Sequence, residues 1–207
     1  MQTIYLIRHS APFIEIENYK DYSNVSWTDY NRNMILSVEG EERSKQLAGL
    51  EELKNIDSIY ASDSFRAIGT AKYISEQNNL KIRLDPRINE RNLGVEKIKD
   101  LPQDFTVNSF KNKDLKYQPG ESLNEIDQRF TEFITEILSS SNKKTVLVIH
   151  GIILMSYLQN NCTFDFDGRN FKLSFNGQEI IDRPLTNPDI FRIDYEDNKI
   201  VNITNII

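Results

Sequence analysis

The sequence has almost no cysteine: Cys162 is the only one among 207 residues. A single cysteine excludes a framework of disulfides within the chain. The start of the sequence, MQTIYLIRH, also lacks the basic region and the length of a secretory signal peptide. These two absences favour a cytoplasmic protein in a reducing environment.

Positive charge is not in excess either. The chain carries 25 Lys and Arg against 31 Asp and Glu, which gives a formal charge of −6. This balance disfavours nonspecific binding to nucleic acid. The strongly apolar run Ile4–Ile7 is too short to span a membrane, and we expect no membrane partner. A site for an anion must therefore be built from a few specific arginines.

Internal boundaries are missing as well. No stretch rich in Pro, Gly or Ser, no block of like charge and no repeat divides the chain. With 39% hydrophobic and 27% charged residues, the composition is that of an ordinary globular protein. We therefore expect one domain over residues 1–207, large enough to bury a sizeable core.

Patterns typical of strands and helices alternate along the chain. Serines that can cap a helix precede three helical stretches, and the last of these has the clearest apolar stripe. Strands are predicted at Ile4–Ile7, Ile56–Ala61, Lys81–Leu84 and Thr145–Ile149, and helices after Ser37, Ser64 and Ser122. This order predicts an α/β fold: a three-layer α/β/α sandwich around a mostly parallel mixed sheet. Antiparallel strands near the C-terminus, at Phe191–Tyr195 and Ile200–Ile203, are expected to complete the sheet.

Three stretches show little periodicity. Residues 13–35 are polar and rich in aromatic side chains, which fits either a lid over a site or a plain surface excursion. Residues 95–119 are predicted to form a cap segment with short helical pieces. In residues 163–188, alternating apolar side chains suggest one further strand or hairpin, and no chemistry is assigned there.

The chain has only two histidines, and each directly follows a buried strand. Arg8 and His9 end the first strand, and His150 with Gly151 ends the strand Thr145–Ile149. The carboxyl ends of parallel strands meet at one edge of a sheet, where α/β proteins bind ligands. An arginine beside a histidine suggests anion binding together with a nucleophile or a proton carrier. One such histidine is usually structural, whereas two at the same edge favour a site.

Two further residues belong to this argument. Arg66 lies in the first turn of the helix after Ser64, so its guanidinium can point to the same edge of the sheet as Arg8. An ordinary surface arginine is the alternative. Glu90 lies in the non-periodic segment INERNLG, and taken alone it carries no signal.

With these residues in place, the sequence resembles the histidine phosphatase superfamily, also called the phosphoglycerate mutase-like family. Matching motifs follow one another in the family's order over nearly the whole chain. They are IRHS (7–10), LSVEG (36–40), SDSFRAIGTA (62–71), NERNLG (89–94), and PGES (119–122) followed by VLVIHG (146–151). Each motif is unspecific alone, and the ordered set is what carries the resemblance.

The resemblance implies a role for each of these side chains. His9 would be the nucleophile that becomes phosphorylated, and Glu90 would be the proton donor. Arg8, Arg66 and His150 would hold the phosphoryl oxygens, consistent with the need of phosphoryl transfer for fixed positive charge. The family's reaction needs no metal and no cofactor, and the sequence has no HxxxH or Cys/His cluster that would suggest a metal site.

The chain departs from the family after the Arg-His pair. The family usually has Gly and then Glu, Gln or Thr, whereas this chain has Ser10 and Ala11. Ser10 offers a backbone N–H and a hydroxyl, so we expect it to bind phosphate together with Gly151. Ala11 removes a polar side chain that could have contacted the substrate. Substrate preference is therefore affected more than chemistry.

These features favour a metal-independent phosphomonoester hydrolase that acts through phosphohistidine on a small phosphorylated metabolite or a phosphosugar-like substrate. A phosphoglycerate mutase is an alternative, disfavoured because NLGVEKIK (92–99) replaces the Tyr-Gly-x-Leu-x-Gly continuation of the glycolytic mutases. A phosphate-binding protein without turnover is the other alternative. The sequence leaves a monomer and a homodimer equally open.

Overall fold

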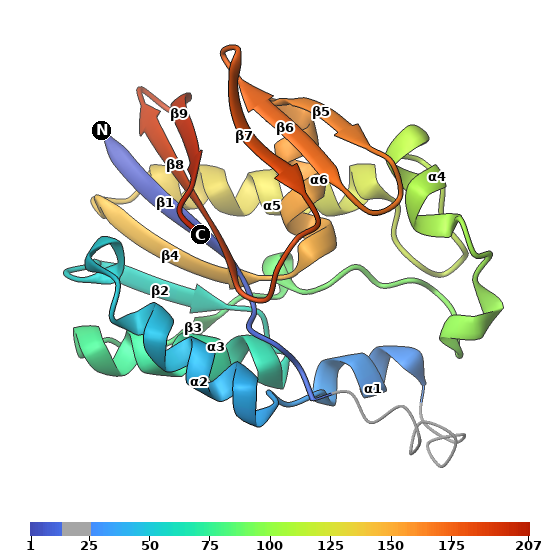
Figure 1. Ribbon diagram of the computed structural model, residues 1–207, viewed down its shortest axis with the longest axis horizontal. Coiled ribbons are helices and arrows are strands. Elements are labelled where there is room, and N and C mark those ends of the chain that lie inside the picture. Colours follow the sequence, from blue (N-terminus) through green and yellow to red (C-terminus); the bar gives the residue numbers. More distant parts are fainter. Residues whose placement is uncertain (14–25) are drawn as a thin grey trace.

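A six-stranded sheet forms the centre of the computed structural model, which describes residues 1–13 and 26–207 (Figure 1). Its strands lie in the order β3-β2-β4-β1-β8-β9. They are β1 (Gln2–Arg8), β2 (Ser58–Ala61), β3 (Arg83–Leu84), β4 (Lys144–Ile149), β8 (Asp189–Glu196) and β9 (Lys199–Asn205). Strands β1 to β4 pair in parallel, whereas β8 is antiparallel to β1 and β9 is antiparallel to β8. The predicted mostly parallel mixed sheet is confirmed.

Helices cover both faces of this sheet (Figure 1). Strand β1 shows why its sequence is a continuous apolar run. Ile4 and Leu6 pack into the core under two helices, while Tyr5 and Ile7 face the core under two others. The first pair is α5 (Leu123–Leu138) and α6 (Gly151–Asn161), and the second is α2 (Val38–Ala48) and α3 (Phe65–Asn78). The predicted three-layer α/β/α sandwich is confirmed.

Helix α5 forms as its sequence predicts. The Ser122 hydroxyl accepts a hydrogen bond from the Glu125 N–H at 3.2 Å, and the Glu125 carboxylate accepts the Ser122 N–H at 2.7 Å. This reciprocal capping box satisfies two donors at the start of the helix. Ile126, Phe130 and Phe133 recur at helical spacing on one face and are completely buried.

Two strands are shorter than predicted: β2 begins at Ser58 instead of Ile56, and β3 begins at Arg83 instead of Lys81. Helix α2 is capped by Ser37 and ends at Ala48, and Leu53 reaches the core from a short 3-10 turn beyond it. Strand β3 is confined to two residues, because it is an edge strand that pairs only with Tyr60 and Ala61 at the end of β2. The 3-10 turns lie at Glu51–Leu53, Pro86–Ile88 and Ile98–Asp100.

The predicted lid at 13–35 lies partly outside the described residues, which omit 14–25. Its described part contains helix α1 (Trp27–Asn33), whose N-terminus is capped by Ser26. No residue of α1 is buried. The predicted cap segment at 95–119 contains a 3-10 turn and helix α4 (Phe105–Lys111), so the expectation of short helical pieces is confirmed.

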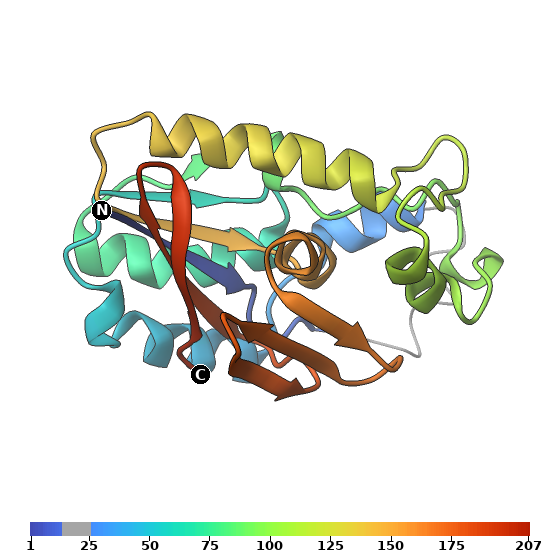
Figure 2. The same cartoon turned by 90° about the horizontal axis from the view of Figure 1, so that it is seen from above.

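Residues 163–188 form more structure than the single strand or hairpin predicted. They make a separate three-stranded antiparallel sheet of β5 (Thr163–Phe166), β6 (Phe171–Phe175) and β7 (Gln178–Arg183). Phe171 and Leu173 of the central strand are buried, whereas the two outer strands contain a single buried residue, Ile181 of β7. Strand β5 alternates as well, with Phe164 and Phe166 partly buried against the core, whereas β7 has two adjacent apolar residues, Ile180 and Ile181. Figure 2 shows α4 at the end of the molecule away from the N-terminus.

Within the described part of the chain, no helix is long and apolar enough to cross a membrane.

Candidate active site

Three neighbouring parallel strands bring their carboxyl ends to one edge of the sheet. Arg8, the last residue of β1, is in register with Ile149, the last residue of β4. The His9 N–H donates to the Ile149 carbonyl at 2.9 Å, and the Ser62 N–H donates to the Val148 carbonyl at 3.1 Å. The first residues beyond β1, β2 and β4 therefore lie side by side, as expected for a ligand site of an α/β sheet.

His9 is held as a neutral imidazole. Its Nδ1–H donates to the Ser10 carbonyl at 2.8 Å, and its Nε2 accepts a hydrogen bond from Arg66 Nε–H at 3.0 Å. Burial, together with the positive charge of Arg66, keeps the pKa of His9 well below its ordinary value. The lone pair needed for nucleophilic attack therefore resides on Nε2, with the other nitrogen anchored to the backbone.

His150 lies beside His9 and is also neutral. Its Nε2–H donates to Ser62 Oγ at 2.8 Å, and its Nδ1 accepts from Arg66 Nη2 at 3.0 Å. The two imidazole rings meet edge to face, with their centroids 5.1 Å apart. Complete burial and the neighbouring Arg66 lower the pKa of His150 well below its ordinary value.

Arg66 connects the two histidines. It lies in the first turn of α3 and is only 3% exposed. Its three guanidinium nitrogens donate to His9, to His150 and to the carbonyl of Asn31 on α1. The lone pair of His9 Nε2 is therefore occupied by the Arg66 guanidinium in this structure.

Arg8 carries a donor without a partner. Its Nη1 donates to the carbonyls of Leu185 and Thr186 at 3.1 and 3.2 Å, whereas its buried Nε has no partner among the described residues. A Cβ at Gly151 would lie 3.3 Å from this Nε, so glycine lets the guanidinium approach the start of α6 closely. A buried free N–H at a helix N-terminus is suited to an anion.

Glu90 faces the histidines from the segment after β3. Its Oε2 lies 3.7 Å from His150 Nδ1, and its Oε1 accepts the Arg91 N–H at 3.0 Å. Burial raises the pKa of the Glu90 carboxyl, against the pull of the nearby Arg66 and Arg8. A carboxyl with a raised pKa beside a neutral histidine is suited to donate a proton.

Ser10 is placed differently from the other predicted site residues. Its N–H donates to Thr70 Oγ1 at 2.9 Å, and its hydroxyl donates to the Gly40 carbonyl at 2.8 Å. Both donors are thus engaged within the protein, and the observed contact of Ser10 with the site is its carbonyl, which fixes the tautomer of His9. The predicted phosphate contact of Ser10 stays a prediction.

Asn187 is a site residue that sequence reasoning missed. Its side-chain amide donates to the His9 carbonyl at 2.8 Å, and Arg43 Nη1 donates to the Asn187 carbonyl at 2.6 Å. Residues before β8 meet the end of β1 because the two strands are antiparallel, with Arg8 opposite Asp189. The pairing of β8 with β1 is the signal that points to Asn187. This residue lies within 163–188, where the sequence alone predicts no chemistry.

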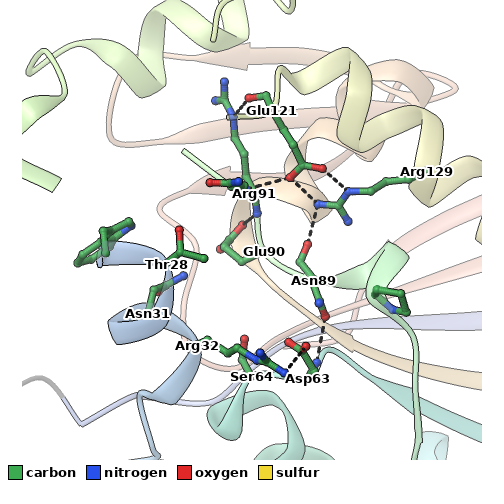
Figure 3. Close-up of a pocket in the computed structure, with 13 residues that line it drawn as sticks. Thr28, Asn31, Arg32, Asp63, Ser64, Asn89, Glu90, Arg91, Glu121 and Arg129 are labelled. Carbon is green, nitrogen blue, oxygen red and sulfur yellow. Dashed lines mark hydrogen bonds and ion pairs between the residues drawn. The ribbon is translucent and has the colours of Figure 1, made fainter. Parts of the chain in front are cut away.

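A pocket of about 410 Å³ opens beside Glu90 (Figure 3). One wall is α1, which contributes Thr28, Asn31 and Arg32. The opposite wall is the segment 86–92, together with residues from the loops and helix that surround it. Its volume is in the range of sites for small metabolites. Within the described residues, no group of three or more His, Cys, Asp or Glu side chains could hold a metal ion.

The sequence is similar to that of a known protein family and of several of its members. The model of the histidine phosphatase superfamily (branch 1) matches residues 4–178. The chain is 27% identical over 164 residues to a protein of Escherichia fergusonii named probable phosphoglycerate mutase GpmB, covering 74% of this chain and 72% of that protein. It is 29% identical over 127 residues to phosphoserine phosphatase 1 of Hydrogenobacter thermophilus, covering 58% of this chain and 60% of that one.

Solved structures share the fold. Mycobacterial glucosyl-3-phosphoglycerate phosphatase in complex with inorganic phosphate superposes with a TM-score of 0.70 at 15% identity, covering 100% of this chain and 96% of that one. At this identity the match concerns the fold alone. It agrees with the mixed six-stranded sheet covered by helices on both sides.

Proposed function

The chain belongs to branch 1 of the histidine phosphatase superfamily, and we propose that it is a phosphomonoester hydrolase working through a phosphohistidine intermediate. The observation that carries the proposal is the pairing of a neutral histidine with a carboxyl of raised pKa. His9 is neutral with its lone pair on Nε2, and Glu90, beside His150, has a raised pKa. The first step of the reaction requires a neutral nucleophile and an acid, and these two side chains are suited to those roles.

In that step, His9 Nε2 attacks the phosphorus of the ester and the bond to the ester oxygen breaks. The electron pair leaves with that oxygen, which takes the proton of Glu90. Arg66 and the free Nε–H of Arg8 stabilise the charge that spreads over the phosphoryl oxygens. In the second step, water attacks phosphohistidine, its proton returns to Glu90, and His9 is regenerated with release of inorganic phosphate.

A hydrolase is favoured over a mutase by the sequence after the acid, where the continuation found in the glycolytic mutases is absent. The relatives themselves differ in activity: one is named a phosphoglycerate mutase and another a phosphoserine phosphatase. The proposed substrate is therefore a small phosphorylated metabolite, and the proposed reaction uses no metal and no cofactor.

The test is hydrolysis of p-nitrophenyl phosphate in the presence of a chelator. We expect release of phosphate by the unmodified chain and a loss of roughly 10³-fold or more in His9→Ala, because the nucleophile itself is removed. The wild-type protein, quenched during turnover, should carry a phosphoryl group on His9 that survives alkali and is lost in acid.

Three results would contradict the proposal. Full activity in His9→Ala would remove the assigned nucleophile. Conversion of 3-phosphoglycerate to its 2-phospho isomer, detected by coupling to enolase, would assign a mutase. Tight binding of inorganic phosphate with neither a burst nor turnover on a broad panel of phosphate esters would assign a phosphate-binding protein.

A further inference from the structure

The pocket beside Glu90 contains several charged side chains, and its arginines are already engaged. Arg129 Nε donates to Glu121 Oε1 at 2.8 Å, and its Nη2 donates to Glu121 Oε2 at 3.1 Å. Arg91 is 5% exposed and donates to Ser109 Oγ and to the carbonyls of Leu115 and Glu121. Neither guanidinium is available to a second anionic group of a substrate.

The third arginine of the pocket is paired as well. Arg32 projects from α1 toward the loop after β2, where its Nη2 lies 2.8 Å from Asp63 Oδ2 (Figure 3). The Asp63 side chain is 27% exposed. The Arg32 side chain is 56% exposed. A substrate carboxylate that approaches Arg32 would have to share the guanidinium with Asp63 and would meet the repulsion of that carboxylate, and like charges at this distance cost free energy.

The rest of this wall is polar and uncharged. The Thr28 hydroxyl and the Asn31 side-chain amide line the pocket, and no described residue hydrogen-bonds to either. The Trp27 ring lines the pocket as well. Amide and hydroxyl groups next to an acceptor such as Asp63 can donate to and accept from the hydroxyls of a ligand.

We infer that the leaving group of the substrate is a neutral, polyhydroxylated group such as a sugar or polyol, and that the Arg32–Asp63 pair determines specificity by rejecting a second anion. The inference rests on the proposed phosphatase function and adds to it the class of substrate. Thr28, Asn31 and Asp63 bind the hydroxyl groups, while Arg8 and Arg66 are reserved for the phosphate.

Two esters that differ in a single group test this inference. Glycerol 3-phosphate and 3-phosphoglycerate share the phosphate and its primary ester, and differ in a CH₂OH group against a carboxylate. We expect kcat/KM of the wild-type chain to be about tenfold or more higher for glycerol 3-phosphate, the size of effect typical of one mismatched charged contact. Asp63→Asn should free Arg32 and shift the ratio toward 3-phosphoglycerate by about tenfold.

Arg32→Gln is the matched variant, and it should move the ratio in the opposite direction. It leaves the Asp63 carboxylate without its cation, so 3-phosphoglycerate should be disfavoured still further. If the ion pair had a purely structural role, both variants would lower kcat/KM equally for the two esters. Thermal melting of each variant verifies that it is folded before its ratio is compared.

The possible results distinguish a failure of this inference from a failure of the proposed phosphatase function. If p-nitrophenyl phosphate is hydrolysed but 3-phosphoglycerate is the better of the two esters, or the two variants leave the ratio unchanged, the inference is overturned and the phosphatase assignment stands. If no ester is hydrolysed, the phosphatase assignment is overturned, and the inference with it.

Discussion

Arg66 holds both histidines of the candidate site in the neutral state. Its guanidinium gives both imidazoles a hydrogen bond that only a bare ring nitrogen can accept. The same positive charge lowers the pKa of each histidine. Arg66 thus favours the neutral form of His9 to lower pH.

The pH dependence of kcat/KM should report His9 and Glu90 together. The nucleophile must be deprotonated, so activity falls in acid below the ordinary histidine value of 6.5, where the lowered pKa of His9 lies. The donor must be protonated, so activity falls as pH rises through the pKa of Glu90, which lies above 4.5. A bell-shaped profile, limited in acid by His9 and in alkali by Glu90, is expected for glycerol 3-phosphate.

Glu90→Gln is the variant that isolates the alkaline limb. Gln keeps an acceptor for the Arg91 N–H, which Glu90 now satisfies at 3.0 Å, so the local fold should remain. We expect kcat for glycerol 3-phosphate to fall by about 10²- to 10⁴-fold. The loss should be much smaller for p-nitrophenyl phosphate, whose leaving anion is stable without a proton. Equal losses on both substrates would exclude Glu90 as the proton donor.

At the scale of elements, the start of α2 supports the loop that follows His9. The Ser37 N–H and hydroxyl both donate to the Ala11 carbonyl, at 3.0 and 3.2 Å. Gly40, in the first turn of α2, accepts the Ser10 hydroxyl through its carbonyl. The LSVEG motif therefore has a physical reason: its serine caps the helix, and its glycine leaves room for the backbone of the loop.

Gly40→Ala should destabilise the fold and impair the site. A Cβ at this position would lie 2.0 Å from the Ala11 carbonyl oxygen, a backbone atom that cannot give way without moving the loop beside His9. We expect a loss of about 1–3 kcal/mol in the free energy of unfolding, measured with urea, together with reduced kcat. This overpacking outweighs the better helix propensity of alanine.

Gly69→Ala in α3 is the matched control. There the added Cβ would meet Leu36 Cδ1 at 3.0 Å, the far end of a flexible side chain. The helix propensity of alanine should then dominate, with a change between neutral and about 1 kcal/mol of stabilisation. If both variants destabilised the protein equally, close approach of the loop would not be the reason for glycine at position 40.

At the scale of the whole molecule, the site stands on a sheet with a packed core on each face. The core beneath α5 and α6 is rich in aromatic side chains, among them Phe130, whose ring meets that of Tyr157 edge to face with centroids 5.0 Å apart. None of the described site residues belongs to this core. The stability of the sheet and the chemistry at its edge should therefore be separable.

Ile137→Ala tests this separation. Ile137 is 3% exposed near the C-terminal end of α5. Its truncation should lower the free energy of unfolding by about 2–5 kcal/mol, and the melting temperature by about 2–4 °C for each kcal/mol. Below the transition, kcat should equal that of the wild-type chain. An exposed neighbour, Glu132→Ala, should change stability by no more than about 0.5 kcal/mol.

A large drop in kcat of folded Ile137→Ala would show that the core beneath α5 adjusts the site at the edge of the sheet. In that case the two properties would be coupled, and the site could not be treated as independent of the helical layer. Measuring kcat at several temperatures below the transition distinguishes this coupling from partial unfolding.

Local patterns in the sequence determined the central sheet, its covering helices and the residues that end its strands. Parallel strands buried on both faces leave continuous apolar runs, and His9 and His150 stand directly after two of them. The capping serines determined where α2 and α5 begin. Assigning Arg66 and Glu90 to the site required the ordered family motifs as well, because neither residue is identified by its local sequence alone.

Only the tertiary structure decided which distant residues complete the site. Asn187 reaches His9 because β8 pairs with β1, and Arg32 meets Asp63 because α1 lies beside the loop after β2. Strand β7 has two adjacent apolar residues, Ile180 and Ile181, in place of an alternation, so its sequence pattern does not predict a strand. A local pattern records which face of an element is buried. A pocket is made by contacts between elements far apart in the chain, and spacing along the sequence does not encode those contacts.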